Sequence, residues 1–110
     1  VDCGIVINPE TARGQVEGGI NFGLSAALGE RITLEAGRVV ESNFHDYPLL
    51  RLPDAPRIEV AFIRSDAAPG GLGEPGTPPN AYAHANAVFA APGVLVGELP
   101  LRDVDLVLRG

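Results

Sequence analysis

Residues 70–79 read Gly-Gly-Leu-Gly-Glu-Pro-Gly-Thr-Pro-Pro and join an expected strand to an expected helix. Glycine permits backbone conformations that other residues avoid, whereas proline fixes φ and removes a donor, so we expect a rigid loop of defined shape. Such a loop can hold the side chain of Glu74 in one orientation. The pattern leaves two interpretations open: a formed site that uses the Glu74 carboxylate, or an ordinary surface loop in which Glu74 is solvated.

The sequence on either side of this loop predicts regular structure. Alternating apolar positions indicate a strand over residues 57–64. After the loop, Thr77 is expected to cap a helix whose first turn holds the prolines at 78 and 79, and this helix is expected to continue to residue 91, before Pro92-Gly93. Residues 104–108 are expected to form a terminal strand.

An earlier helix is predicted from Asn8-Pro9 through about Glu30. Asn can cap free N–H groups, and Pro is tolerated at the first helical position. One apolar stripe recurs at helical spacing, and we expect it to pack on a sheet. Its members are Val16, Ile20, Leu24, Ala27 and Leu28.

Several glycines interrupt this helix, among them Gly18, Gly19 and Gly23. Each costs roughly 1 kcal/mol relative to Ala in a helix interior. Their presence indicates that something approaches the helix closely, either another backbone or a cofactor. Tight helix packing alone remains the alternative.

The remaining segments predict an α+β fold. Residues 1–7 and 31–41 are expected to form strands, the second segment as a hairpin that turns at Ala36-Gly37, and residues 43–56 an extended connection. We expect a small mixed or antiparallel sheet with two helices packed on one face. Because the chain begins within an expected strand, we expect it to be a piece of a longer protein.

Composition narrows the function classes. The chain has 110 residues, 45% of them hydrophobic, and a formal net charge of −6, which argues against a nucleic-acid partner. The single cysteine, Cys3, cannot form an intramolecular disulfide and is expected to be a core residue, and no His or Cys pair has metal-ligand spacing. No apolar run reaches the length of a membrane span, so we expect a soluble chain, cytoplasmic or periplasmic in a bacterium.

Several motifs together resemble a known family. They are Val1-Asp-Cys-Gly, Asn8-Pro9, Gln15-Val-Glu-Gly-Gly, Gly23-Leu-Ser-Ala-Ala-Leu, Gly71-Leu-Gly-Glu-Pro-Gly-Thr-Pro-Pro and Leu99-Pro-Leu. With its motifs in this order, the chain resembles the molybdenum-binding large subunit of the xanthine oxidase family. Within that family it is most similar to the isoquinoline 1-oxidoreductase beta-subunit and aldehyde oxidoreductase type. The resemblance implies that residues 1–110 are the C-terminal segment of a larger molybdopterin-binding domain.

The resemblance also implies roles for particular residues. Glu74 matches the general base of the family's Gly-Glu-Pro motif, which acts at the molybdenum centre while water supplies the oxygen of the product. Gln15 matches a glutamine that hydrogen-bonds the molybdopterin cofactor, and Gly73 is expected to allow close packing around it. No residue of this chain is expected to ligate the metal directly.

The implied partners are the remainder of the large subunit, a two-iron two-sulfur subunit and a small N-heteroaromatic or aldehyde substrate. The implied cofactor is molybdopterin in its cytosine dinucleotide form, with none expected on the isolated chain, which is expected to be inactive and to self-associate through uncovered apolar surface. The alternative is a stand-alone structural or interaction module that keeps the fold without catalysis.

Overall fold

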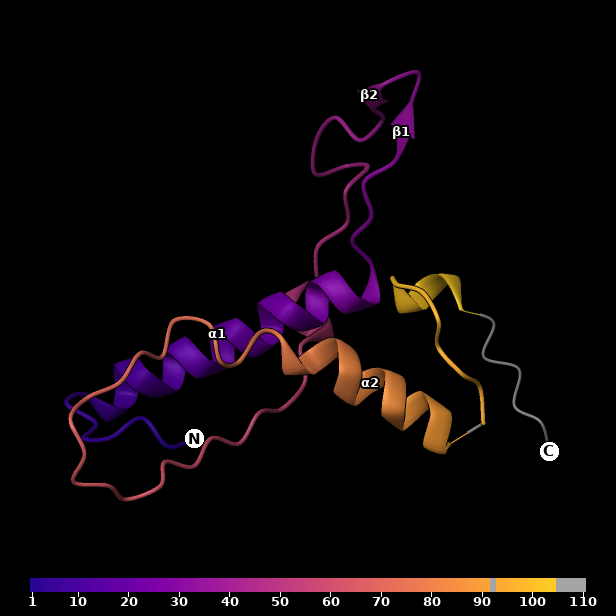
Figure 1. Ribbon diagram of the computed structural model, residues 1–110. Coiled ribbons are helices and arrows are strands. Elements are labelled where there is room, and N and C mark those ends of the chain that lie inside the picture. The colour runs from indigo at the N-terminus through magenta and orange to yellow at the C-terminus, as the bar shows by residue number, and fades with distance from the viewer. Residues whose placement is uncertain (92, 105–110) are drawn as a thin grey trace.

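The computed structural model describes residues 1–91 and 93–104. These residues form two α-helices, a small hairpin and long connections (Figure 1). In chain order the elements are α1 (Pro9–Leu28), β1 (Leu34–Glu35), β2 (Arg38–Val39), the short 3-10 helix η1 (Leu52–Asp54), α2 (Pro79–Ala90) and a second 3-10 helix, η2 (Leu101–Asp103). The Cα radius of gyration is 17.1 Å, whereas a compact chain of this length has about 13 Å. The arrangement is therefore open.

Helix α1 begins where the sequence predicts. The side chain of Asn8 accepts a hydrogen bond from the backbone N–H of Thr11 at 3.2 Å, and Pro9 is the first helical residue. At the other end, the N–H of Gly29 donates to the carbonyl of Ser25 at 3.1 Å. The predicted helix is confirmed, and it ends slightly before Glu30.

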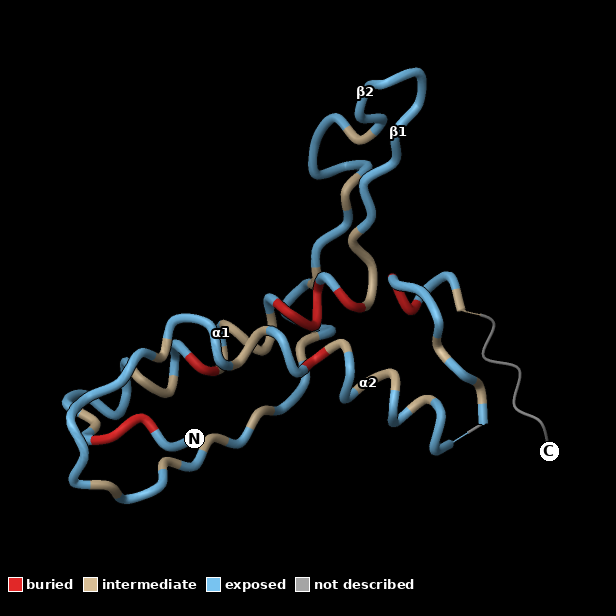
Figure 2. The backbone as a smooth tube through the Cα atoms, viewed as in Figure 1, coloured by how far each residue is buried: buried red, intermediate tan, exposed pale blue. Residues whose placement is uncertain are grey.

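The apolar stripe of α1 supplies much of a small core. Val16, Leu24 and Ala27 are buried, and Figure 2 shows the other buried segments near the N-terminus, at the start of α2 and in η2. The stripe packs against α2 and the loop that leads to it, rather than on a sheet. Cys3 is also buried, as expected.

The hairpin matches its prediction. Strands β1 and β2 are antiparallel, with Leu34 opposite Val39. Ala36 and Gly37 have φ of 49° and 77°, the left-handed pair that a tight two-residue hairpin turn requires. All residues of both strands are exposed, and the hairpin projects away from the helices (Figure 1). The α+β class is confirmed, but the helices pack on each other because this short hairpin offers no buried face.

Segments 1–7 and 57–64 are extended neighbours without regular strand structure. The N-terminal amine of Val1 donates to the carbonyl of Ala61 at 2.8 Å, and its carbonyl accepts from Ile63 at 2.8 Å. Farther along, Ile5 donates to Ala67 at 3.0 Å. The predicted strands therefore lie side by side, but Gly4, with φ of 71°, interrupts the extended backbone between these hydrogen bonds.

Helix α2 differs from its prediction at its start. Pro78 occupies the N-cap position without a side-chain hydrogen bond, and Pro79 is the first helical residue. The prediction that Thr77 caps the helix is wrong, because its hydroxyl donates to the carbonyl of Gly19 in α1 at 3.1 Å. The helix ends at Ala90. Of the terminal strand expected over 104–108, residues 105–108 lie outside the described residues.

Many large apolar side chains remain exposed. Examples are Phe22 on α1, Leu52 in η1 and Tyr82 on α2, with exposed fractions of 71%, 90% and 74%. Among the described residues, no large side chain is fully buried. The described helices include none that is both long enough and apolar enough to span a bilayer.

Candidate functional site

The loop before α2 folds back in a tight turn. The N–H of Thr77 donates to the carbonyl of Glu74 at 2.9 Å, which leaves Pro75 and Gly76 as the two central residues. Proline favours the first central position of a β-turn because its φ is already fixed near the required value. The turn therefore gives the Glu74 backbone a defined conformation.

This turn lies directly on α1. A Cβ atom added to Gly76 would lie 2.8 Å from the carbonyl oxygen of Val16 and 3.2 Å from the backbone nitrogen of Ile20. No side chain fits between the two backbones there. Figure 1 shows the loop running along α1 before it enters α2.

The contact between loop and helix brings two predicted site residues together. The side-chain Nε2 of Gln15 donates a hydrogen bond to the carbonyl oxygen of Gly73 at 3.0 Å, across 58 positions of sequence. Gly73 immediately precedes Glu74. All three predicted site residues therefore meet at one place.

The three residues line a concavity of about 400 Å³ between α1 and the loop. Its lining comprises Gln15, Gly18, Gly19, Phe22, Gly73, Glu74, Thr77 and Pro78. The Glu74 side chain belongs to an exposed residue. Among residues 1–91 and 93–104, no cationic group lies within ion-pair distance of its carboxylate. The carboxylate is thus exposed at the lining of this concavity.

Gly18, Gly19 and Gly23 of α1 differ in what surrounds them, and they divide between tight packing and space for a cofactor. Gly19 and Gly23 face the loop: an added Cβ at Gly19 would lie 3.3 Å from the Thr77 hydroxyl, and one at Gly23 would overlap the Thr77 carbonyl. An added Cβ at Gly18 would meet nothing within 4 Å. Close backbone packing thus explains Gly19 and Gly23, while Gly18 leaves open space at the wall of the concavity.

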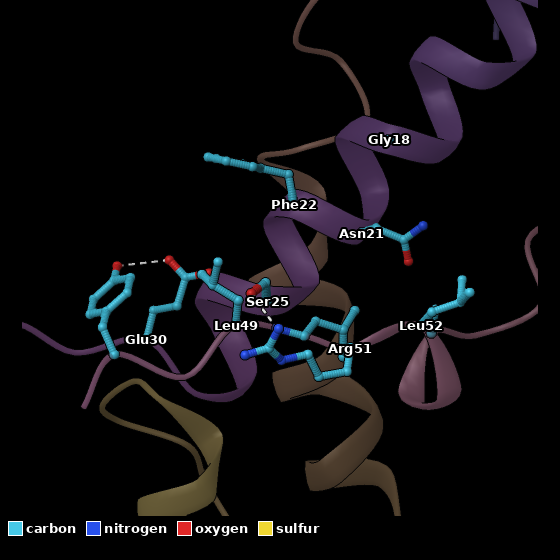
Figure 3. Close-up of a pocket in the computed structure, with 11 residues that line it drawn as sticks. Gly18, Asn21, Phe22, Ser25, Glu30, Leu49, Arg51 and Leu52 are labelled. Atoms are coloured by element: carbon cyan, nitrogen blue, oxygen red, sulfur yellow. Dashed lines mark hydrogen bonds between the residues drawn. The ribbon is translucent and has the colours of Figure 1, made fainter. Parts of the chain in front are cut away.

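A second, larger concavity of about 570 Å³ was not predicted from the sequence (Figure 3). It lies along α1 and the segment from Tyr47 to Ala55, and its lining includes Phe22 and the polar residue Glu30. The hydroxyl of Tyr47 donates to Glu30 at 2.8 Å, and this bond is the main reason that the pKa of Tyr47 is raised. No sequence pattern indicated this concavity, because the residues that line it come from segments that are far apart in the sequence.

The cluster His45-Asp46-Tyr47 does not form a continuous relay. The carboxylate of Asp46 accepts hydrogen bonds from the backbone N–H groups of Asn43 and Ser42, both at 2.9 Å, which lower its pKa to about 2. Tyr47 instead bonds Glu30. The side chains of Asp46 and Tyr47 therefore have separate partners.

Comparison with known proteins defines the class. A model of the molybdopterin cofactor-binding domain matches residues 1–56. The chain is 42% identical over 110 residues to the membrane-bound aldehyde dehydrogenase (pyrroloquinoline-quinone) of Gluconacetobacter polyoxogenes, covering 100% of this chain and 14% of that protein. It is 41% identical over 102 residues to isoquinoline 1-oxidoreductase subunit beta of Brevundimonas diminuta, covering 93% and 13%.

A solved structure of a related enzyme has a similar fold. Quinoline 2-oxidoreductase from Pseudomonas putida 86 matches with a TM-score of 0.77 and 26% sequence identity, over 91% of this chain and 14% of that chain. The chain belongs to the molybdenum-binding subunits of the xanthine oxidase family, which confirms the resemblance carried by its motifs. It spans about one seventh of the length of these relatives.

The residues of the smaller concavity fit one edge of a molybdopterin cofactor. After its bond to Gly73, the Gln15 amide still has one N–H and its carbonyl oxygen, a donor and an acceptor without net charge. An added Cβ at Gly18 or Gly73 would meet nothing within 4 Å, so a flat ring can approach the backbone there. The described part of the chain contains no group of three or more His, Cys, Asp or Glu side chains that could hold a metal ion.

Proposed function

We propose that this chain is the C-terminal segment of the large subunit of a molybdenum hydroxylase, with Glu74 as its general base. The observation that carries the proposal is the hydrogen bond from Gln15 to Gly73, because it joins the expected cofactor-binding side chain to the residue that precedes the expected base. Both then face one concavity. A loop of turn residues held on a helix is a suitable support for a base that must be fixed in position.

The residues of this chain have separate tasks in the proposed reaction. The Glu74 carboxylate accepts a proton as water-derived oxygen becomes a nucleophile, and its fixed backbone supplies the orientation that such a step requires. Gln15 binds the cofactor edge through its amide, and Gly18 and Gly73 allow that edge to come close. The bound molybdenum cofactor would supply the redox chemistry.

The proposed substrate is an N-heteroaromatic compound or an aldehyde, oxidised at carbon. The names of three relatives support this class: isoquinoline 1-oxidoreductase, quinoline 2-oxidoreductase and an aldehyde dehydrogenase. The aldehyde dehydrogenase is named with pyrroloquinoline quinone. The matching domain family is named for molybdopterin, which supports that cofactor for this chain. A single cofactor-binding concavity can serve both substrate classes when other parts of the subunit shape the substrate cavity.

The proposal includes partners beyond this chain. The rest of the large subunit would complete the pocket and cover exposed apolar residues such as Phe22 and Leu52. A two-iron two-sulfur subunit would take the electrons, and the cofactor would be the cytosine dinucleotide form. The chain covers only 14% of its aldehyde dehydrogenase relative, which supports the proposal that it is inactive when isolated.

The test is the substitution Glu74→Gln in the complete subunit, purified with its iron–sulfur partner. Glutamine keeps the shape of the side chain but is not a base, so turnover should fall about 10²-fold to 10⁴-fold while molybdenum content stays unchanged. Glu35→Gln on the exposed strand β1 is the matched control. Turnover near wild type for Glu74→Gln would contradict the assignment and favour a structural module.

A further inference from the structure

Backbone packing determines how the loop sits on α1. Gly23 and Gly76 each lie where a Cβ atom would collide with the opposing segment: the first with the carbonyl of Thr77, the second with the carbonyl of Val16 at 2.8 Å. Because backbone atoms cannot move aside as a flexible side chain can, these contacts fix the spacing between loop and helix. They do not by themselves prevent the loop from sliding along the helix.

Thr77 supplies that restraint by bonding the loop to α1, and Asn80 bonds the same loop to the first turn of α2; we refer to Thr77 and Asn80 as the clamp. The hydroxyl of Thr77 donates to the carbonyl of Gly19 in α1 at 3.1 Å. The Nδ2 atom of Asn80 donates to the carbonyls of Gly76 at 2.5 Å and Thr77 at 3.1 Å. Asn80 is only 8% exposed, so these bonds satisfy a polar group that would be costly to bury unpaired.

The clamp lies next to the proposed base. Thr77 closes the turn that begins at Glu74 through a backbone hydrogen bond of 2.9 Å. A shift of Thr77 along α1 therefore moves Glu74 relative to Gln15, which is on the same helix. The clamp acts on the carboxylate through the turn and does not need to touch the reacting atoms.

We propose that Thr77 and Asn80 are positioning residues that set the place of the Glu74 carboxylate relative to Gln15. This inference rests on the proposed function of Glu74 as general base. Misplacing a catalytic group by about 1 Å can lower a rate by about 100-fold. The clamp thus contributes to turnover through the geometry of Glu74.

The test compares Thr77→Val with Thr77→Ser in the complete subunit with its iron–sulfur partner. Valine keeps the shape but removes the donor to Gly19, so kcat should fall about 10-fold or more, with little change in KM or molybdenum content. Serine keeps the hydroxyl and should recover most of the loss. A kcat for Thr77→Val within about twofold of wild type, or a loss of molybdenum that parallels the loss of turnover, overturns the inference.

A double-mutant cycle separates positioning from a general structural role. If Thr77 acts through Glu74, Thr77→Val should cause little further loss of turnover in a Glu74→Gln background. Full additivity overturns the inference. If Glu74→Gln is inactive and Thr77→Val is fully active, the positioning role of the clamp is contradicted while Glu74 remains the proposed base. If Glu74→Gln is active, the proposed function itself is contradicted.

A second variant keeps the test valid if Thr77→Val does not fold. Gly23→Ala introduces a Cβ that overlaps the Thr77 carbonyl, whereas Gly14→Ala on the same helix meets nothing within 4 Å and is the matched control. Gly23→Ala should lower kcat and speed amide exchange at Thr77, and Gly14→Ala should do neither. Equal effects of the two substitutions overturn the inference.

Discussion

Gln15 in α1 donates a 3.0 Å hydrogen bond to the carbonyl of Gly73, 58 residues later in the chain. This bond places the amide of one predicted site residue beside the residue that precedes the predicted base. Gly19 and Gly76 lie at the contact between α1 and the loop, and their lack of side chains lets these two segments approach closely enough for the bond to form. The account of function depends on this juxtaposition.

Gln15→Leu should weaken cofactor retention. Leucine has a similar volume but neither the donor to Gly73 nor the acceptor proposed for the cofactor edge. We expect the complete subunit to contain less molybdenum and pterin per protein, with the fold intact by circular dichroism. Thr11→Val, at an exposed position near the start of the same helix, is the control. Unchanged cofactor content in Gln15→Leu would contradict the binding role.

Leu24→Ala should destabilise the chain far more than Leu52→Ala. The two substitutions remove the same atoms, but Leu24 is 4% exposed and Leu52 is 90% exposed. Truncation of a buried leucine costs about 2–5 kcal/mol, whereas an exposed one costs about 0.5 kcal/mol or less. Urea denaturation of both variants measures the difference. Equal midpoints would show that Leu24 lies outside the core.

Asp46 should contribute stability that depends on pH. Backbone N–H donors, first that of Asn43 and then that of Ser42, lower the folded-state pKa from 3.8 to about 2. The contribution is therefore complete above the unfolded value of 3.8 and is lost as pH falls through about 2. The melting temperatures of wild type and Asp46→Asn should converge over this range. A difference that persists unchanged at the lowest pH would contradict the carboxylate's role.

The hairpin turn predicts opposite effects at its two central residues. Ala36 has φ of 49°, which is unfavourable for alanine but tolerated by asparagine. Ala36→Asn should therefore stabilise the hairpin by a few tenths to about 1 kcal/mol, and Gly37→Ala should destabilise it by about 1 kcal/mol. Hydrogen exchange at the Val40 amide, which donates to Thr33 at 3.0 Å, reports the change. Effects of equal sign would contradict the turn geometry.

The chain produced alone should self-associate. Large apolar side chains on three different elements are exposed, including Phe22, Leu52 and Tyr82, and exposed apolar patches of this kind favour association. Light scattering after size-exclusion chromatography should show a mass that rises with concentration. A monomer at every concentration would contradict this prediction and would mean that these side chains do not form a contiguous apolar interface.

Local rules predicted the local elements well. The cap at Asn8, the stripe around Leu24 and the turn at Ala36-Gly37 each depend on neighbours within a few positions, and the structure confirms them. The role of Thr77 could not be obtained in this way. Its preferred partner is a carbonyl of α1, and a tertiary hydrogen bond replaced the local capping bond that its position in the sequence favours.

The candidate site was predictable in composition but not in geometry. Motif resemblance indicated Gln15 and Glu74, yet only the folded chain shows that the Gln15 amide reaches Gly73. The larger concavity beside Tyr47 had no signal, because a cavity depends on how separate segments pack. The interrupted pairing of segments 1–7 and 57–64 depends on the left-handed backbone of Gly4, which alternation of apolar residues does not reveal.

The central claim is that Glu74 is the base of a molybdenum hydroxylase. The most direct measurement is the anaerobic rate at which a heteroaromatic or aldehyde substrate reduces the complete enzyme in a single turnover, with wild type and Glu74→Gln matched for molybdenum content. The account predicts that Glu74→Gln is reduced about 10²-fold to 10⁴-fold more slowly. Reduction of Glu74→Gln at the wild-type rate would contradict it.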